Sequence, residues 1–305
     1  MGGKIAVVGA GAIGLYYGAR MAAAGEDVRF LLRSDYDAVI QEGVWVESVH
    51  GDLHLPSVKA YRTSEEIGPV DWVIVAWKAT ANHNFEPILG PLLGPNTKIL
   101  TLQNGLGNDV SLGELFGRDR VLGGLCFVCI NRVGPGRVVH TAGGKITVGE
   151  LEPIEDHARA RKVASALNAA GIPSEAAESL PQAQWRKLVW NVPFNGLAIV
   201  EGGLTTDQIL ELEGGEEEVV SLMREVIAVA RVKGHEVDPS VIEFEIERTR
   251  PMGAYRPSSM IDFVEGKPVE YEAIWGEPLR QAKEAGVEVP HLEKLAARLR
   301  NCLAR

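Results

Sequence analysis

The 305-residue chain has few cysteines, no long apolar run and no long basic run, and each absence excludes a class of protein. Its three cysteines are too few for the disulfide framework of a small secreted protein, which agrees with a reducing compartment. Its apolar runs are far shorter than the roughly 20 residues of a membrane-spanning helix. Residue 1 leads directly into an apolar strand pattern, so no signal peptide is expected either. We therefore expect a cytoplasmic protein without a membrane partner.

The charge balance argues against another class of partner. The chain carries 41 acidic and 31 basic residues, a net charge of −10, so nucleic acid is not an expected partner. An anionic substrate would need a local positive site, because the net negative charge of the protein repels it. The length leaves room for two domains, each with its own core.

Metal-ligand patterns are also absent. The seven histidines are scattered without ligand spacing. Cys126 and Cys129 form a C-x-x-C, but the surrounding residues 121–130 have the pattern of a strand, on which these two side chains point to opposite faces. No second pair completes a zinc site. We expect both cysteines to be buried in the core, and we predict no metal.

The most informative pattern lies at the start of the chain, where the apolar run 5–8 leads into a glycine-rich turn of the form G-x-G-x-x-G. Gly9 allows the tight turn, Gly11 lets a pyrophosphate approach the backbone, and Gly14 lets the following helix pack against the strand. The predicted helix 13–25 and strand 28–32 complete a βαβ unit, which makes a glycine turn of another α/β fold the weaker interpretation. The residues expected to bind a dinucleotide are Gly9, Ala10, Gly11, Ala12, Ile13 and Gly14.

The end of the second predicted strand indicates which dinucleotide binds. NAD enzymes usually carry an acidic residue here for the ribose 2′-hydroxyl, whereas NADP enzymes place an arginine near the 2′-phosphate. This chain has Arg33 followed by Ser34, which suits a phosphate and favours NADP. Asp35 and Asp37 follow closely, so NAD stays open, as does an Arg33 that is only a solvated loop charge.

Strands alternate with helices through the first half of the chain, the pattern of a parallel sheet. We predict an N-terminal Rossmann-type, doubly wound α/β domain over residues 1–177 and an all-helical domain over 178–305, with the active site in the cleft between them. Further predicted elements of the first domain are a hairpin at 44–56, strands at 72–77 and 98–103, an antiparallel pair at 121–130 and 136–142 that ends the sheet, a helix at 156–170 and a strand at 172–176. The helices predicted in the second domain cover residues 182–199, 215–233, 239–250, 269–285 and 290–304.

The predicted helix 182–199 combines two apolar faces with a narrow polar stripe. On a helical wheel, Trp185, Leu188, Val189 and Val192 form one apolar face, and Trp190 and Phe194 lie almost opposite it. Gln184, Lys187, Asn191 and Asn195 form the stripe between them. A mostly buried helix with one polar band is expected to face a polar cleft, and Pro193 is expected to kink it. A solvated stripe with a snorkelling Lys187 is the weaker alternative.

Several motifs together resemble the ketopantoate reductase family, also called 2-dehydropantoate 2-reductase. They are the GAGAIG turn, Arg33, Lys78, 103-QNGLG-107, 185-WRKLVWN-191 with Asn195, 258-SSM-260 and 268-PVEYE-272, in this order along nearly the whole chain. The resemblance implies NADPH-dependent reduction of a small-molecule 2-oxo acid to a 2-hydroxy acid, ketopantoate to pantoate in pantothenate biosynthesis. It leaves a homodimer open.

The resemblance also implies roles for individual residues. Lys187 matches the catalytic lysine, which polarises the keto oxygen and protonates it, and Glu270 matches the active-site glutamate. The positions that match substrate contacts are Asn104, Asn191, Asn195 and Ser259, and Lys78 and Asn104 border the cofactor. Without the resemblance, a surface carboxylate near a helix start would be the favoured interpretation of Glu270.

The chain departs from the family pattern on the predicted substrate side. Arg256 stands at a position where family members often have an asparagine. The segment between Ser259 and Glu270 is one residue shorter than in better-known members, and residues 261–263 stand in place of a Gln-Asp pair. Trp275 replaces an asparagine that is common near the glutamate. Arg256 could clamp an acidic group of the substrate bidentately, or point to solvent or pair with Glu265. Two alternatives therefore stay open: a reductase of the same family for another 2-oxo acid, and a non-catalytic NADP-binding sensor.

Overall fold

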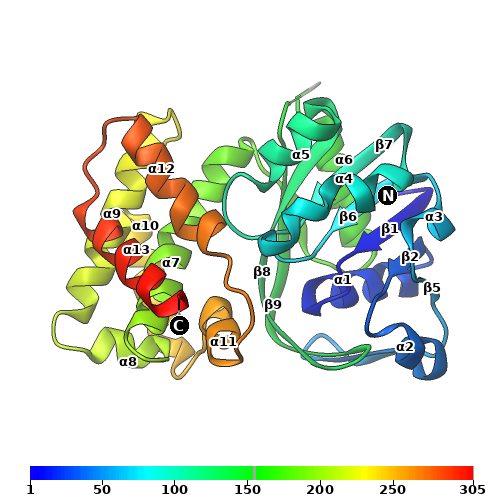
Figure 1. Ribbon diagram of the computed structural model, residues 1–305, viewed down its shortest axis with the longest axis horizontal. Helices are drawn as coiled ribbons and strands as arrows, with labels where there is room; N and C mark the ends of the chain where they lie inside the picture. The colour runs from blue at the N-terminus through cyan, green and yellow to red at the C-terminus, as the bar shows by residue number, and fades with distance from the viewer. Residues whose placement is uncertain (154–155, 305) are drawn as a thin grey trace. The chain divides into compact units, whose positions relative to one another are not determined.

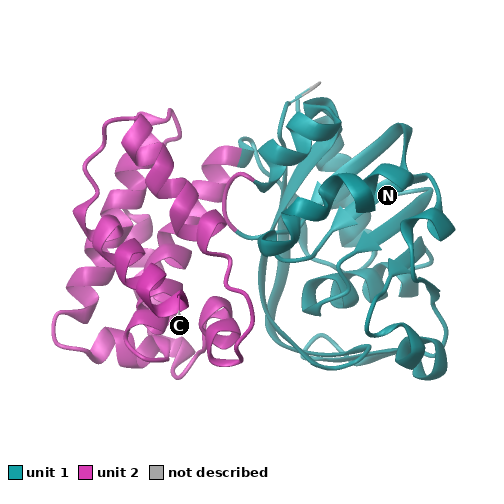
Figure 2. Cartoon of the chain, in the orientation of Figure 1, with its two compact units in different colours: residues 1–104, 108–180 teal, residues 105–107, 181–305 magenta. Residues whose placement is uncertain are grey.

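The computed structural model describes residues 1–153 and 156–304, which form two compact units (Figures 1 and 2). Unit 1 comprises residues 1–104 and 108–180, and unit 2 comprises residues 105–107 and those from 181 onward. The chain therefore passes between the units three times, at 104/105, 107/108 and 180/181. No helix in the described ranges is both long enough and apolar enough to cross a membrane.

Unit 1 is built on a ten-stranded sheet in the order β4-β3-β9-β8-β7-β6-β1-β2-β5, with β10 paired to β9. The strands are β1 Lys4–Val8, β2 Asp27–Leu31, β3 Val44–Ser48, β4 Leu53–Leu55, β5 Lys59–Tyr61, β6 Val70–Val75, β7 Leu93–Thr101, β8 Val121–Gly134, β9 Arg137–Glu150 and β10 Ser174–Ala176. The α-helices are α1 Ala12–Ala23, α2 Tyr36–Glu42, α3 Ser64–Ile67, α4 Phe85–Leu89, α5 Asn108–Phe116 and α6 Ala158–Ala169, with 3-10 turns η1 Ala79–Asn84, η2 Gly90–Leu92 and η3 Arg118–Arg120.

Alternate residues of the central strands belong to different cores, which shows that helices cover both faces of the sheet. In β1, Ile5 and Val7 pack in one core with residues of α1 and α6. Ala6 and Val8 pack in the other core with residues of α3, α4 and α5. This two-residue period follows from the pleat of a strand buried on both faces. The doubly wound α/β fold predicted from the sequence is confirmed.

The first βαβ unit and the hairpin of β3 and β4 are also confirmed, but the predicted edge of the sheet is wrong. The antiparallel pair β8 and β9 does not end the sheet, because β3 pairs with β9 in parallel and β4 extends the sheet beyond β3. An uncovered β9 would expose a row of unpaired backbone groups. β3 pairs with the start of β9, over Arg137–His140, and β10 pairs with it over Ile146–Val148.

The two cysteines of the C-x-x-C differ in burial. Cys126 is buried as expected, whereas Cys129 is only half-buried, which corrects that part of the prediction. The register of β8 against β9 shifts between Phe127 and Val128 and again between Cys129 and Ile130. Such bulges bend a strand and change the direction of its side chains, so the simple alternation assumed from the sequence does not hold here.

Unit 2 is helical, as predicted, and has its own core. Its elements are α7 Leu180–Val200, whose first residue still belongs to unit 1, α8 Thr206–Glu211, α9 Gly215–Val232, α10 Val241–Thr249, η4 Arg250–Met252, α11 Ser258–Val264, the π-helical turn η5 Glu272–Gly276, α12 Glu277–Glu284 and α13 Pro290–Leu303. The predicted helix 269–285 is thus a π-helical turn followed by an α-helix. The sequence pattern predicts neither α8 nor α11.

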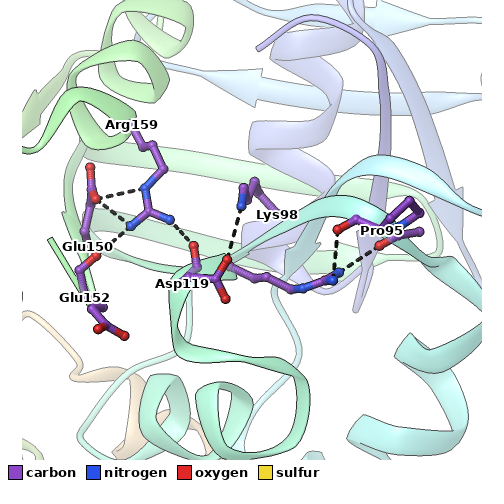
Figure 3. A network of polar contacts seen from close by, with 8 residues as sticks. Pro95, Lys98, Asp119, Glu150, Glu152 and Arg159 are labelled. Carbon is purple, nitrogen blue, oxygen red and sulfur yellow. Dashed lines mark hydrogen bonds and ion pairs between the residues drawn. The ribbon is translucent and has the colours of Figure 1, made fainter. Parts of the chain in front are cut away.

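A network of polar contacts joins β9 to the start of α6 (Figure 3). The side chain of Glu150 is fully buried, and Arg159 donates to its Oε2 from both Nε and Nη2. The amide of Ala160 donates to Glu150 Oε1 at 3.0 Å. A charge-assisted pair of this kind is costly to break on one side only, because the remaining charge stays buried.

We expect Arg159→Ala to lower the free energy of unfolding by about 3–5 kcal/mol, because it removes the guanidinium that pairs with the buried Glu150 carboxylate. The measurement is urea unfolding. Arg161→Ala is the matched control on the same helix, since Arg161 pairs with Asp156 on the exposed surface and should change stability by less than about 1 kcal/mol. Equal losses in the two variants would contradict the interpretation.

Candidate active site

The glycine-rich turn between β1 and α1 has the geometry that a dinucleotide requires. Gly9 has φ +93°, and a Cβ there would lie 2.2 Å from the backbone nitrogen of Trp77. A Cβ on Gly14 would lie 2.3 Å from the Gly9 carbonyl oxygen, so both positions exclude a side chain. At Gly11, by contrast, no described atom beyond the adjoining residues lies within 4 Å of the position a Cβ would take.

That open position lies at the N-terminus of α1. Gly11 is the N-cap of the helix and supplies no side-chain cap to the first amides. Amides at a helix start are donors for an anion, and the helix dipole favours negative charge there. The turn therefore fits the pyrophosphate of a dinucleotide, with access over Gly11 and close packing at Gly9 and Gly14.

Arg33 follows β2 and is exposed. Its side chain forms no hydrogen bond or ion pair with any residue that the structure describes, so its guanidinium is available to a ligand. The neighbouring acidic residues are not available in this way. Asp35 is buried and accepts hydrogen bonds from Arg132 and from the amide of Gly136, and Asp37 accepts one from Arg62 at 2.6 Å.

Burial by itself would raise the pKa of the Asp35 carboxyl. Hydrogen bonds from Arg132, Gly136 and Ser34 more than offset burial, and they lower this pKa below its ordinary value. Asp35 is therefore an ionised structural residue that holds the loop after β2. Because Ser34 donates to Asp35 at 2.9 Å, its hydroxyl is engaged within the protein as well.

Lys78 and Asn104 both follow parallel strands at their carboxyl ends, where open α/β sheets bind ligands. Lys78 is exposed and is the N-cap of η1, three residues after β6 ends at Val75. Asn104 is half-buried after β7, and its carbonyl accepts a hydrogen bond from Asn108 at 2.9 Å. Both residues thus lie at the same edge of the sheet as the glycine turn, since β1, β6 and β7 are neighbouring parallel strands.

Helix α7 has the burial pattern predicted from the wheel. Both apolar faces are buried, with exposed fractions of 9% or less at Trp185, Leu188, Val189, Trp190, Val192 and Phe194. Along the polar stripe, Gln184, Lys187 and Asn191 are half-buried, and Asn195 is buried. A half-buried lysine between two buried apolar faces has a restricted set of positions, which suits a group that must meet one substrate atom.

Asn195 joins α7 to α11. Its Oδ1 accepts the backbone amide of Ser259 at 3.0 Å, and its Nδ2 donates to the Asn191 carbonyl at 3.1 Å. Ser259 itself is 2% exposed. Asn195 therefore holds the first turn of α11, where orphan amides need an acceptor, next to the polar stripe of α7. Direct contact of Asn195 and Ser259 with a substrate stays a prediction.

The segment around Glu270 packs against α7 through Trp275. Glu270 is buried, and Trp275 in the following π-helical turn is fully buried and donates its indole N–H to the Val192 carbonyl at 2.9 Å. A Cβ on Gly196 would lie 2.9 Å from the same indole nitrogen. Trp275 is thus a core residue that holds this segment against α7.

Arg256 precedes α11 and is exposed, and its side chain forms no ion pair or hydrogen bond with the described residues. The alternative pairing with Glu265 is not present, since Glu265 pairs with Lys267. No three His, Cys, Asp or Glu side chains in the described ranges gather as metal ligands.

No pattern in the sequence predicts two of the polar residues near Asn104. Asn82 and Asn108 form hydrogen bonds with each other and with the segment around Asn104. Their separation of 26 residues gives no periodic signal. Only their positions after neighbouring strands, β6 and β7, could have indicated them.

The fold and these residues define an NAD(P)-dependent oxidoreductase with a Rossmann-type domain and a helical domain. Family models described as "Ketopantoate reductase PanE/ApbA" and "Ketopantoate reductase PanE/ApbA C terminal" match residues 5–153 and 179–302. The chain belongs to the ketopantoate reductase family, which confirms the resemblance seen in the sequence. Members of this family reduce 2-oxo acids to 2-hydroxy acids.

Relatives agree over nearly the full length. A 2-dehydropantoate 2-reductase of Nostoc sp. is 40% identical over 303 residues, which cover 97% of this chain and 94% of that protein. The crystal structure of 2-dehydropantoate 2-reductase from Geobacter metallireducens GS-15 is 44% identical, with a TM-score of 0.95 over 98% of this chain and 99% of that one. A ternary structure of D-mandelate dehydrogenase with NADH and anilino(oxo)acetate shares the fold, with a TM-score of 0.90 at 22% identity over 99% and 98% of the two chains.

Proposed function

We propose that this protein uses NADPH to reduce 2-dehydropantoate to pantoate. The choice of cofactor rests on Arg33, which is exposed and whose guanidinium forms no hydrogen bond or ion pair with the described residues. Asp35 and Asp37, by contrast, are both paired with arginines. A free guanidinium suits a 2′-phosphate, and a paired carboxylate is poorly available to a ribose hydroxyl. The likeness to the 2-dehydropantoate 2-reductase of Nostoc sp. supports the choice of substrate.

In this proposal, unit 1 binds the cofactor, and unit 2 supplies the catalytic residues. The glycine turn would hold the pyrophosphate of the cofactor on the amides of α1, and Lys78 and Asn104 would border the cofactor. The domain boundary is proposed at residues 177 and 178, close to the passage between the compact units at residues 180 and 181. When bound, NADPH would supply the hydride for the carbonyl carbon of the substrate.

Lys187 acts on the other atom of the carbonyl. Its ammonium donates a hydrogen bond to the keto oxygen, stabilises the negative charge that develops there, and transfers a proton to that oxygen as the C–H bond forms. The alcohol product thus receives its hydride on carbon and its proton from the lysine. Glu270 holds the distal hydroxyl of the substrate and helps to orient Lys187, while Asn104, Asn191, Asn195 and Ser259 bind the remaining polar groups.

The test is a panel of 2-oxo acids assayed with NADPH and with NADH, following the loss of cofactor absorbance. The highest kcat/KM is expected for 2-dehydropantoate with NADPH. A higher value for another 2-oxo acid would refute the proposed substrate, and a complete lack of turnover with binding of NADPH would favour the sensor. Such a sensor would need neither Lys187 nor the polar stripe of α7.

One observation favours a second candidate substrate: Arg256 is exposed, and its side chain pairs with no residue that the structure describes. A guanidinium before α11 can bind a second carboxylate bidentately, so we propose that a 2-oxo dicarboxylate is also reduced. We expect Arg256→Asn to lower kcat/KM for the dicarboxylate by about tenfold or more, because a charge-assisted hydrogen bond to the second carboxylate is lost. The value of kcat/KM for 2-dehydropantoate should stay unchanged. The measurement is the ratio of the two efficiencies, and an unchanged ratio would refute the clamp.

A further inference from the structure

A chain of side-chain hydrogen bonds joins the segments that follow β6 and β7. Thr101 Oγ1 donates to Gln103 Oε1 at 2.9 Å, and Gln103 Nε2 donates to Asn82 Oδ1 at 2.7 Å. Asn82 Nδ2 donates to Asn108 Oδ1 at 2.7 Å, and Asn108 Nδ2 donates to the Asn104 carbonyl at 2.9 Å. We call these five residues the amide relay.

The carbonyl at one end of the amide relay determines the orientation of every amide in it. A backbone carbonyl only accepts, so Asn108 must present its Nδ2 to Asn104. Asn108 then presents Oδ1 to Asn82, which must donate from Nδ2 and present its own Oδ1 to Gln103. Reversal of any one amide would place two donors or two acceptors face to face. The amide relay therefore has a single arrangement, and each bond supports the next.

The amide relay joins the two residues of unit 1, Asn104 and Asn108, that flank a three-residue segment of unit 2. The chain leaves unit 1 after Asn104 and returns to it at Asn108, and the intervening residues 105–107 belong to unit 2. Gly105 and Gly107 have φ +83° and +85°, and glycine restricts the backbone least of all residues. Leu106 between them is buried, and its amide donates to the Ala273 carbonyl at 2.8 Å, so the middle of this segment is held within unit 2. The bond from Asn108 to the Asn104 carbonyl restrains the base of the segment in unit 1.

The other end of the amide relay reaches the segment that carries Lys78. Asn82 lies in η1, whose N-cap is Lys78, and its hydrogen bonds to Gln103 and Asn108 tie this turn to the end of β7. Thr101 and Asn108 are each 4% exposed, so water competes little for the bonds at both ends. The two residues predicted to border the cofactor in unit 1, Lys78 and Asn104, are therefore held by one network.

We propose that Asn82 and Asn108 are positioning residues for the reduction, acting through the backbone of Asn104. The inference rests on the proposed function, because it takes Asn104 as a residue beside the nicotinamide and the substrate. Hydride transfer depends steeply on geometry, and a displacement of about 1 Å can cost about 10²-fold in rate. Binding of the pyrophosphate and the 2′-phosphate depends on the glycine turn and Arg33, which lie outside the amide relay.

The test is Asn82→Asp, which keeps the shape of the side chain but cannot donate to Asn108. We expect kcat to fall about 10- to 100-fold, while KM for NADPH changes by less than about threefold. Gln103→Glu removes the donation to Asn82 and should produce the same division between kcat and KM. The matched control is Asn84→Asp, since Asn84 is also half-buried in η1 but donates to the Ala81 carbonyl outside the amide relay. Its kcat should stay at the wild-type value.

A second measurement does not depend on activity. Hydrogen–deuterium exchange of the cofactor-free protein should be faster over residues 101–108 in Asn82→Asp than in the wild type or Asn84→Asp. Unchanged exchange, or faster exchange with an unchanged kcat, would overturn the proposal. A wild-type protein that reduces no 2-oxo acid would instead refute the proposed function, and the exchange result would still show whether the amide relay holds this segment.

Discussion

Replacement of Lys187 by alanine is expected to lower kcat about 10²- to 10⁴-fold, the range for loss of a positioned general acid. The lysine lies half-buried on the polar stripe of α7, between the apolar faces that fix the helix in unit 2. Since NADPH is proposed to bind to unit 1, its dissociation constant should change little. The measurements are steady-state turnover with 2-dehydropantoate and a fluorescence titration with NADPH.

Two comparisons make this result interpretable. Gln182→Ala changes an exposed residue near the start of the same helix and should leave turnover unchanged. Thermal unfolding of both variants separates a loss of chemistry from a loss of fold. If Lys187→Ala retained near-normal turnover, the catalytic assignment would be wrong and the non-catalytic sensor would become the better interpretation.

Replacement of Arg33 by alanine should raise KM for NADPH tens- to hundred-fold and change KM for NADH little. A charge-assisted hydrogen bond to a phosphate contributes about 1.5–3 kcal/mol, which corresponds to that range of affinity. The 2′-phosphate is the only group that distinguishes the two cofactors, so the effect should be confined to NADPH. Initial rates over a range of each cofactor measure both constants.

The control for Arg33 is Arg137→Ala. Arg137 is an exposed arginine of the same unit, but its guanidinium already pairs with Glu42 at 2.7 Å. The Arg137→Ala substitution removes one positive charge from unit 1, as Arg33→Ala does, so it measures any general electrostatic effect on the binding of an anionic cofactor. Equal increases of KM for NADPH and NADH in Arg33→Ala would exclude a 2′-phosphate site at this position.

Local patterns in the sequence determined the nucleotide-binding unit and the central helix of unit 2. A glycine turn after an apolar strand is a local requirement, because Gly9 needs a positive φ and Gly14 has no room for a side chain. The burial of α7 likewise follows from helical periodicity alone, and the structure confirms both apolar faces. These features depend on residues that are close together in the chain.

Only the tertiary structure decided features that depend on residues far apart in the chain. Asp35 is unavailable to a ribose because it pairs with Arg132, which lies 97 residues away in the chain. Similarly, β9 is an inner strand of the sheet because β3 pairs with it. Trp275 is a core residue because it meets the Val192 carbonyl, 83 residues earlier. No spacing or periodicity records such pairs, because a hydrogen bond forms wherever folding brings a donor to an acceptor.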